Sequence, residues 1–213
     1  IYQTNENMQT LLVDFLDSSK IDIGQLEVSL KNINLIDIEK EIKRLITKKQ
    51  LLAKKKNIEF KYNSLVDSRL YVLVDLNRIS QVIDNLLENA INYTPAGGKI
   101  EISLANNKND FKFTIADSGI GIPAKEQAKV FVKFFRATNA RKLRSSGTGL
   151  GLYLCKRLIE GHHGKLCFES PARFMKPDTA DQTTAQKANA GAAFSFVLPI
   201  RARQETEELF RKI

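Results

Sequence analysis

The stretch that decides the fold begins as Asp117-Ser118-Gly119-Ile120-Gly121-Ile122-Pro123 and ends as Gly147-Thr148-Gly149-Leu150-Gly151-Leu152. The first glycine cluster follows the alternating run 111–116, which predicts a strand, and the second runs into residues 152–159, whose apolar spacing predicts a helix. Glycine lets the backbone approach a ligand closely. A glycine-rich turn at a helix N-terminus also favours an anion, because unpaired N–H groups and the helix dipole point there. This arrangement predicts a phosphate-binding site.

The segment between the two glycine clusters is basic, which strengthens this prediction. Its cationic residues include Arg136, Arg141, Lys142 and Arg144. Neither the dinucleotide-binding pattern nor the Walker pattern is present, since no Gly-Lys-Ser/Thr follows the glycines. Either cluster alone would be explained as a turn. Together with the basic segment, the two clusters predict a nucleoside triphosphate site of another kind.

The helix predicted from Leu76 to Tyr93 carries an unusual polar face. One side of this helix is apolar, and the other presents Gln81, Asn85, Glu88, Asn89 and Asn92. Asparagine is a poor helix former because its amide competes for backbone hydrogen bonds, so three on one face indicate a functional surface. Asn85 and Asn89 are one turn apart, and their amides can therefore converge on one ligand. An ordinary solvated face, the alternative, would more naturally use Lys and Glu.

The composition limits the class of protein. The 213 residues are 43% hydrophobic and 27% charged, which suits one domain of ordinary size with a short segment to spare. The net charge is +9, but no aromatic residues interleave the basic stretches, so nucleic acid is not the expected ligand. No apolar run of about 18 residues and no signal peptide are visible. We expect a cytoplasmic domain cut from a longer protein, which leaves open whether the parent is anchored in a membrane.

The remaining pattern predicts alternating strands and helices. Further helices are expected at 4–20 and 37–55, and strands at 26–35, 58–62, 71–74, 99–105, 110–116, 164–168 and 192–199. Asp75 is the expected N-cap of the helix that begins at Leu76. Residues 170–191 contain no Leu, Ile or Val and predict a mobile surface loop, and 201–213 predict a short exposed helix. Cys155 and Cys167 share no metal or redox spacing and are expected to be buried, reduced thiols.

Four motifs in this order resemble those of the catalytic ATP-binding domain of sensor histidine kinases, the HATPase_c domain of the GHKL superfamily. They are similar to the N box (QVIDNLLENAINY, 81–93), the G1 box (DSGIGIP, 117–123), the F box (VFVKFFR, 130–136) and the G2 box (GTGLGL, 147–152). Residues 4–26 also resemble the end of the second helix of the family's dimerisation domain.

The resemblance implies a two-layer α/β sandwich of the Bergerat type, in which helices cover one face of a mixed sheet and a remnant helix precedes it. It divides the chain into the C-terminal end of the dimerisation and phosphoacceptor domain (1–26), the catalytic ATP-binding domain (27–200) and a C-terminal tail (201–213). ATP would then lie between the N-box helix and a mobile lid at about residues 124–146.

The resemblance also implies roles for individual residues. Asp117 would accept a hydrogen bond from the adenine amino group, and Tyr93 would pack near the base and ribose. Asn89 would be the Mg²⁺ ligand, since Mg²⁺ takes few protein oxygens and completes its shell with water and phosphate. Catalytic roles fall to Asn85, Glu88 and Arg136, while Arg136, Arg141, Lys142 or Arg144 would offset charge on the γ-phosphate. The implied nucleotide-binding set is Asn85, Asn89, Asn92, Tyr93, Asp117, Gly119, Gly121, Ile122, Lys142, Gly147, Thr148, Gly149, Leu150, Gly151 and Leu152.

Three features depart from the family pattern. Asn92 stands where the family often has Lys or Arg, which puts one phosphate contact in doubt. The usual His-Gly-Gly reads His162-His163-Gly164, and the loop 170–191 is longer than usual. Neither histidine lies in a phosphoacceptor context, so we expect structural roles, with a partly charged imidazole at a helix C-terminus.

The implied function is transfer of the ATP γ-phosphate to a histidine on the dimerisation domain of the same protein, for relay to an aspartate of a response regulator receiver domain. The implied partners are that dimerisation domain, in a homodimer, and the receiver domain. The alternatives are a degenerate nucleotide-binding module that signals by conformation, and another GHKL ATPase or an anti-sigma-factor serine kinase. The dimerisation-helix remnant argues against the second alternative, and intact Asp117, Asn89 and glycine boxes argue against the first.

Overall fold

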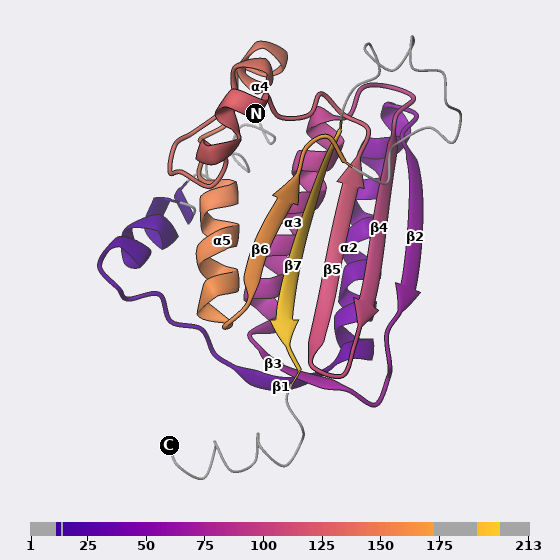
Figure 1. Ribbon diagram of the computed structural model, residues 1–213, viewed down its shortest axis with the longest axis vertical. Coiled ribbons are helices and arrows are strands. Elements are labelled where there is room, and N and C mark those ends of the chain that lie inside the picture. The colour runs from indigo at the N-terminus through magenta and orange to yellow at the C-terminus, as the bar shows by residue number, and fades with distance from the viewer. Residues whose placement is uncertain (1–11, 14, 173–190, 201–213) are drawn as a thin grey trace.

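The computed structural model describes residues 12, 13, 15–172 and 191–200 (Figure 1). The predicted start of the first helix, the middle of the loop 170–191 and the predicted helix at 201–213 lie outside these described residues. Within them, no helix is both long and apolar enough to cross a membrane.

A mixed sheet forms one layer of the fold, as predicted, and within the described residues it has five strands. Its order is β2-β4-β5-β7-β6, and β2 and β4 are parallel while the other neighbours are antiparallel. The strands are β2 (Glu59–Leu65), β4 (Lys99–Asn106), β5 (Asp110–Asp117), β6 (Lys165–Glu169) and β7 (Ala192–Pro199). Side chains of β4 alternate between buried and more exposed positions, as expected for a strand with one covered face.

Three helices cover one face of this sheet, which confirms the two-layer α/β sandwich (Figure 1). They are α2 (Leu35–Lys55), α3 (Leu76–Tyr93) and α5 (Gly151–Gly161). Their apolar stripes meet the sheet over a core in which the rings of Phe113 and Phe196 stack with centroids 5.0 Å apart. Burial of such large side chains contributes most of the stability of a fold of this kind.

The first part of the chain differs from the prediction. A strand was expected over 26–35, but only β1 (Lys31–Asn34) forms, because its partner β3 (Tyr71–Val74) offers four residues to pair with. The following helix begins at Leu35, two residues early, since the side chain of Asn34 accepts a hydrogen bond from the Ile36 N–H at 2.8 Å. Asp75 caps α3 as predicted, accepting from the N–H groups of Asn77 and Arg78.

The segment between the glycine clusters contains the short 3₁₀ helix η1 (Ala124–Lys129) and the helix α4 (Thr138–Leu143). In Figure 1, α4 lies above the N-terminal end of α5.

The ends of the loop 170–191 correct the expectation that this segment packs little. The side chain of Ala172 is 3% exposed, and Gly191 is buried. The Ser170 hydroxyl accepts from the Ile122 N–H at 2.8 Å and donates to the Gly191 carbonyl at 2.9 Å. Both ends are therefore fixed beside the first glycine cluster.

Cys155 is buried, but Cys167 is only half-buried, so the expectation of two buried thiols is wrong for the second.

Candidate nucleotide site

A cavity of about 350 Å³ lies between α3, the turn after β5, the segment around α4 and the start of α5. It brings together most of the side chains and glycines that the sequence nominated. Those that line it are Asn85, Glu88, Asn89, Asn92, Tyr93, Asp117, Gly121, Ile122, Arg136, Gly147, Thr148, Gly149, Gly151 and Leu152. Cavities that hold small-molecule ligands measure about 300–1,000 Å³, so this one is large enough for a nucleotide.

Four nominated residues do not line the cavity. The backbone N–H of Gly119 donates to Asp117 Oδ1 at 2.8 Å, so this glycine lies behind the site. Leu150 is 1% exposed and packs against Ile21 and Leu154. Arg141 and Lys142 are exposed on α4. The first two residues support the walls of the cavity, and the last two lie on the outer surface.

Asp117 places a buried carboxyl group in the cavity wall. Its side chain is 5% exposed, and burial raises its pKa to about 6, although hydrogen bonds from the Gly119 and Ala192 N–H groups act in the opposite direction. A carboxylate with so little solvent is a strong acceptor for a ligand N–H. The residue can therefore bind an amino group in the cavity.

The amide face of α3 forms the opposite wall. Nδ2 of Asn89 donates to Oδ1 of Asn85 at 3.0 Å, which fixes both amides. Gly151 lies directly against Asn85, because a Cβ atom at Gly151 would come within 2.4 Å of Asn85 Nδ2. Helices α3 and α5 thus meet at the cavity through a glycine and an amide.

The second glycine cluster leads into the N-terminus of α5. Gly149 has φ +71°, and a Cβ atom there would lie 2.7 Å from the backbone of Phe134 and Phe135, so only glycine suits this position. Among the described residues, no side chain caps α5, whose N-cap is Leu150. The first N–H groups of a helix have no intrahelical partners. This helix end can therefore bind an anion such as a phosphate.

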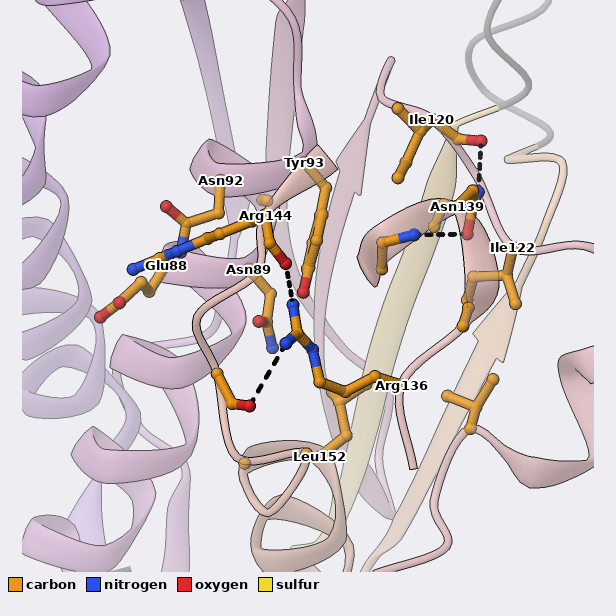
Figure 2. Close-up of a pocket in the computed structure, with 18 of the residues that line it drawn as sticks. Glu88, Asn89, Asn92, Tyr93, Ile120, Ile122, Arg136, Asn139, Arg144 and Leu152 are labelled. Atoms are coloured by element: carbon orange, nitrogen blue, oxygen red, sulfur yellow. Dashed lines mark hydrogen bonds between the residues drawn. The ribbon is translucent and has the colours of Figure 1, made fainter. Parts of the chain in front are cut away.

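All three nominated catalytic residues have protein partners, and that of Asn85 is Asn89. The Arg136 guanidinium donates to the carbonyls of Ser145 at 2.9 Å and of Gly147 at 3.3 Å. It also donates to the carbonyl of Arg144, which lies beside it in Figure 2. Glu88 accepts from Lys49 at 3.3 Å and is half-exposed. Arg136 therefore holds the segment between the glycine clusters in shape, and both Arg136 and Arg144 line the cavity.

Several lining residues were not nominated. They include Ile120, Val130, Phe135, Asn139, Ser146 and Phe194. Phe135 lies within a motif that the sequence did mark, but Asn139 had no comparable signal, because its partners come from a distant turn. Its Nδ2 donates to the Gly121 carbonyl at 2.9 Å and to the Ile120 carbonyl at 3.2 Å, and Figure 2 draws the bond to Ile120.

His162 has the structural role that was expected, but not the expected charge. The ring is 1% exposed, Nδ1 donates to the Leu158 carbonyl at 2.7 Å, and Nε2 accepts from the Asp75 N–H at 3.0 Å. Burial lowers its pKa. One ring nitrogen donates and the other accepts, which is the pattern of a neutral imidazole. His163 is exposed.

The side chains around the cavity suit a cation whose other ligands are phosphate oxygens and water. Within the residues that the structure describes, no three His, Cys, Asp or Glu side chains cluster as a preformed metal site. Asn89 supplies an amide oxygen of the kind that Mg²⁺ accepts when phosphates and water complete its shell. The residues therefore fit a metal that arrives with a nucleotide better than a resident one.

Comparisons with known proteins agree with this geometry. Residues 74–202 match the family described as histidine kinase-, DNA gyrase B-, and HSP90-like ATPase. The chain is 31% identical over 204 residues to the sensor histidine kinase WalK of Bacillus subtilis (strain 168), a match that covers 95% of this chain and 30% of WalK. This chain thus spans less than a third of the length of that relative.

Solved structures give the same assignment. The chain resembles the mycobacterial sensor histidine kinase MprB with a TM-score of 0.61 and 27% identity, over 80% of this chain and 99% of that one. It also resembles the histidine kinase ThkA, solved in complex with the response regulator protein TrrA, with a TM-score of 0.63 and 27% identity over 92% of this chain and 48% of that one. Since the family match covers most of its length, the chain belongs to the histidine kinase-, DNA gyrase B- and HSP90-like ATPases, and its relatives there are sensor histidine kinases.

Proposed function

We propose that this chain is the catalytic domain of a cytoplasmic kinase module that binds ATP with Mg²⁺ and transfers the γ-phosphoryl group to a histidine. The acceptor would lie on the dimerisation domain of the same protein, and an aspartate of a response regulator would receive the phosphate next. The observation that carries the proposal is one cavity lined both by the buried Asp117 carboxylate and by the N-terminus of α5, which no side chain of the described residues caps.

The residues at the Asp117 end of the cavity suit a purine with an amino group. A carboxylate at this position accepts from the adenine amino group, whereas guanine would present a carbonyl oxygen to it. Tyr93 and Ile122 line the same cavity and offer apolar surface to the base. Adenine selection therefore follows from hydrogen-bond polarity at Asp117.

The residues at the other end suit a triphosphate. The N–H groups at the start of α5 hold phosphate oxygens, and Arg144 contributes positive charge. Because Nδ2 of Asn89 is bonded to Asn85, the proposal assigns Oδ1 of Asn89 to Mg²⁺. Bound Mg²⁺ would neutralise phosphate charge, and the chain contributes mainly by positioning. Glu88, on the same face, would orient the incoming imidazole.

Titration calorimetry with MgATP tests the binding step. Asp117→Ala removes a charged hydrogen-bond acceptor, which costs roughly 1.5–3 kcal/mol of binding free energy. The affinity for MgATP should therefore fall about ten- to a hundredfold. Asn89→Ala should reduce the increase in affinity that Mg²⁺ confers, while affinity for metal-free ATP changes little. Asp37→Ala, on the exposed surface of α2, is the control and should bind like the parent. Unchanged affinity in Asp117→Ala would refute the adenine assignment.

A further inference from the structure

Asn139 connects two walls of the cavity that are distant in sequence. It lies in α4, is half-buried and lines the cavity. Its Nδ2 donates to the Gly121 carbonyl at 2.9 Å and the Ile120 carbonyl at 3.2 Å, and its Oδ1 accepts from the Ala140 N–H at 2.9 Å. Because carbonyl oxygens only accept, the two contacts fix which end of the amide faces the turn.

The segment that carries Asn139 is held together by its own contacts. Arg136 bonds to the carbonyls of Ser145 and Gly147. Thr138 donates through both its N–H and its hydroxyl to Glu126. These bonds stay within residues 126–147, so they shape the segment. Before α4, Gln127 donates to the carbonyls of Ile122 and Ser170, and Lys133 pairs with Asp22, so the start of the segment is also fixed to the rest of the domain. The bonds from Asn139 differ, since they connect α4 itself to the turn that follows β5.

That turn belongs to the wall that contains Asp117. The Ile120 N–H donates to the Tyr93 carbonyl at 3.2 Å, and the Gly119 N–H donates to the Asp117 carboxylate. Asn139 therefore joins the segment with Arg136 and Arg144 to the wall with the buried carboxylate. Figure 2 shows this bridge across one side of the cavity.

We propose that Asn139 is a positioning residue that fastens α4 over the bound nucleotide and slows its release. The inference rests on the proposed ATP-binding function and adds a residue that sets nucleotide residence time. Breaking the bridge should leave the first encounter with nucleotide nearly unchanged, because the open cavity still admits it. It should accelerate dissociation, because α4 then opens without giving up two hydrogen bonds.

Two variants and one matched control test this inference on the 213-residue chain. Asn139→Ala removes both bonds, and Asn139→Asp places a carboxylate oxygen against two carbonyl oxygens. The control is Thr138→Ala, an exposed neighbour on α4 whose hydroxyl bond goes to Glu126 within the segment and whose N–H bond remains. Stopped-flow fluorescence with a fluorescent ATP analogue and Mg²⁺ gives the two rate constants, and thermal unfolding reports folding.

The dissociation rate constant should rise about tenfold in Asn139→Ala and further in Asn139→Asp. The association rate constant should stay within about twofold of the parent value, and Tm should not change greatly. Thr138→Ala should match the parent. Dissociation that is equally slow in parent and Asn139 variants would overturn the inference while leaving ATP binding intact. Absence of analogue binding to the parent would overturn the proposed function and, with it, this inference.

Limited trypsin digestion without nucleotide gives an independent readout. Arg141 and Lys142 are exposed on α4 and are potential cleavage sites. Cleavage there should be several-fold faster in both Asn139 variants than in Thr138→Ala. Equal cleavage rates would refute the fastening of α4, whatever the chain binds.

Discussion

Asp117 is the residue at which ligand binding and stability oppose each other. Its carboxyl group is 5% exposed and has a pKa of about 6, against 3.8 for an unperturbed aspartate. Between these two values the folded state binds more protons than the unfolded state. The free energy of unfolding therefore falls as pH rises from about 4 to about 6, and the loss is complete above the folded pKa.

Replacing this carboxylate with an amide should stabilise the ligand-free protein. Asp117→Asn keeps an oxygen for the Gly119 N–H but carries no buried charge. At pH 7 its unfolding free energy should exceed that of the parent by about 1–3 kcal/mol, and the difference should shrink towards pH 4. Urea unfolding at pH 4, 5, 6 and 7 measures this, with Asp37→Asn as an exposed control. A variant less stable than the parent at pH 7 would contradict the account.

Single residues were predicted well where their signal was local. The two glycine clusters and the asparagine face of α3 are readable from neighbouring residues, and most of them line the cavity. Asn139 was missed because its role depends on carbonyls about 18 positions away. The charge of His162 was predicted wrongly, since neither its burial nor the Asp75 N–H that reaches its ring is visible in the sequence.

At the scale of elements, α5 shows why a glycine must stand at its first residue. A Cβ atom at Gly151 would collide with the Asn85 amide. At Gly161, the other end of the same helix, a Cβ atom would meet Val28 at 3.7 Å and Leu26 at 4.0 Å, which are ordinary contact distances. Both glycines belong to the same helix, but only Gly151 lines the cavity. Gly161 therefore serves as a control for Gly151, because it is a glycine of the same helix that the site does not require.

Gly151→Ala should reduce ATP affinity more than stability. The new methyl group would displace the Asn85 amide and break its 3.0 Å bond with Asn89, so affinity should fall tenfold or more while Tm changes by a few degrees. Gly161→Ala should bind ATP normally and be stabilised by up to about 1 kcal/mol, because alanine favours helix. Calorimetry and thermal unfolding of both variants check this. Equal affinities in the two variants would refute the contact between α5 and the asparagine face.

Element boundaries were predicted less well than element types. The helix 76–93 was placed correctly, because a cap and a strong apolar stripe define it locally. The strand expected over 26–35 shrank to β1, whose length is set by β3 rather than by its own residues. The ends of the loop 170–191 pack beside the first glycine cluster although their composition suggested otherwise.

At the scale of the whole molecule, the residues before the sandwich are fastened to the site. Arg78 at the start of α3 pairs with Asp17 at 2.8 Å, and Asp17 is 6% exposed. Ile21 packs against Leu150 of the second glycine cluster. Asp22 pairs with Lys133, between the glycine clusters, at 2.6 Å. The upstream helical residues therefore contact three parts that surround the cavity.

The two histidines of the chain are poor phosphate acceptors for geometric reasons. Both ring nitrogens of His162 are engaged inside the protein, and His163 follows it at the far end of α5 from the cavity, where the helix ends at Gly161. Phosphoryl transfer needs in-line approach at near-contact distance. The proposed transfer therefore needs an acceptor other than these two histidines.

Phosphate incorporation from labelled ATP is the most direct test of the central claim, that the chain is a kinase acting on a separate histidine. Incubated alone, the chain should acquire no acid-labile phosphate. With the dimerisation domain of the parent protein added as a separate polypeptide, label should appear slowly on that domain, because a bimolecular encounter replaces a tethered one, and Asn89→Ala should abolish it. Label on His162 or His163 of the chain alone, or none on the added domain despite confirmed ATP binding, would contradict the account.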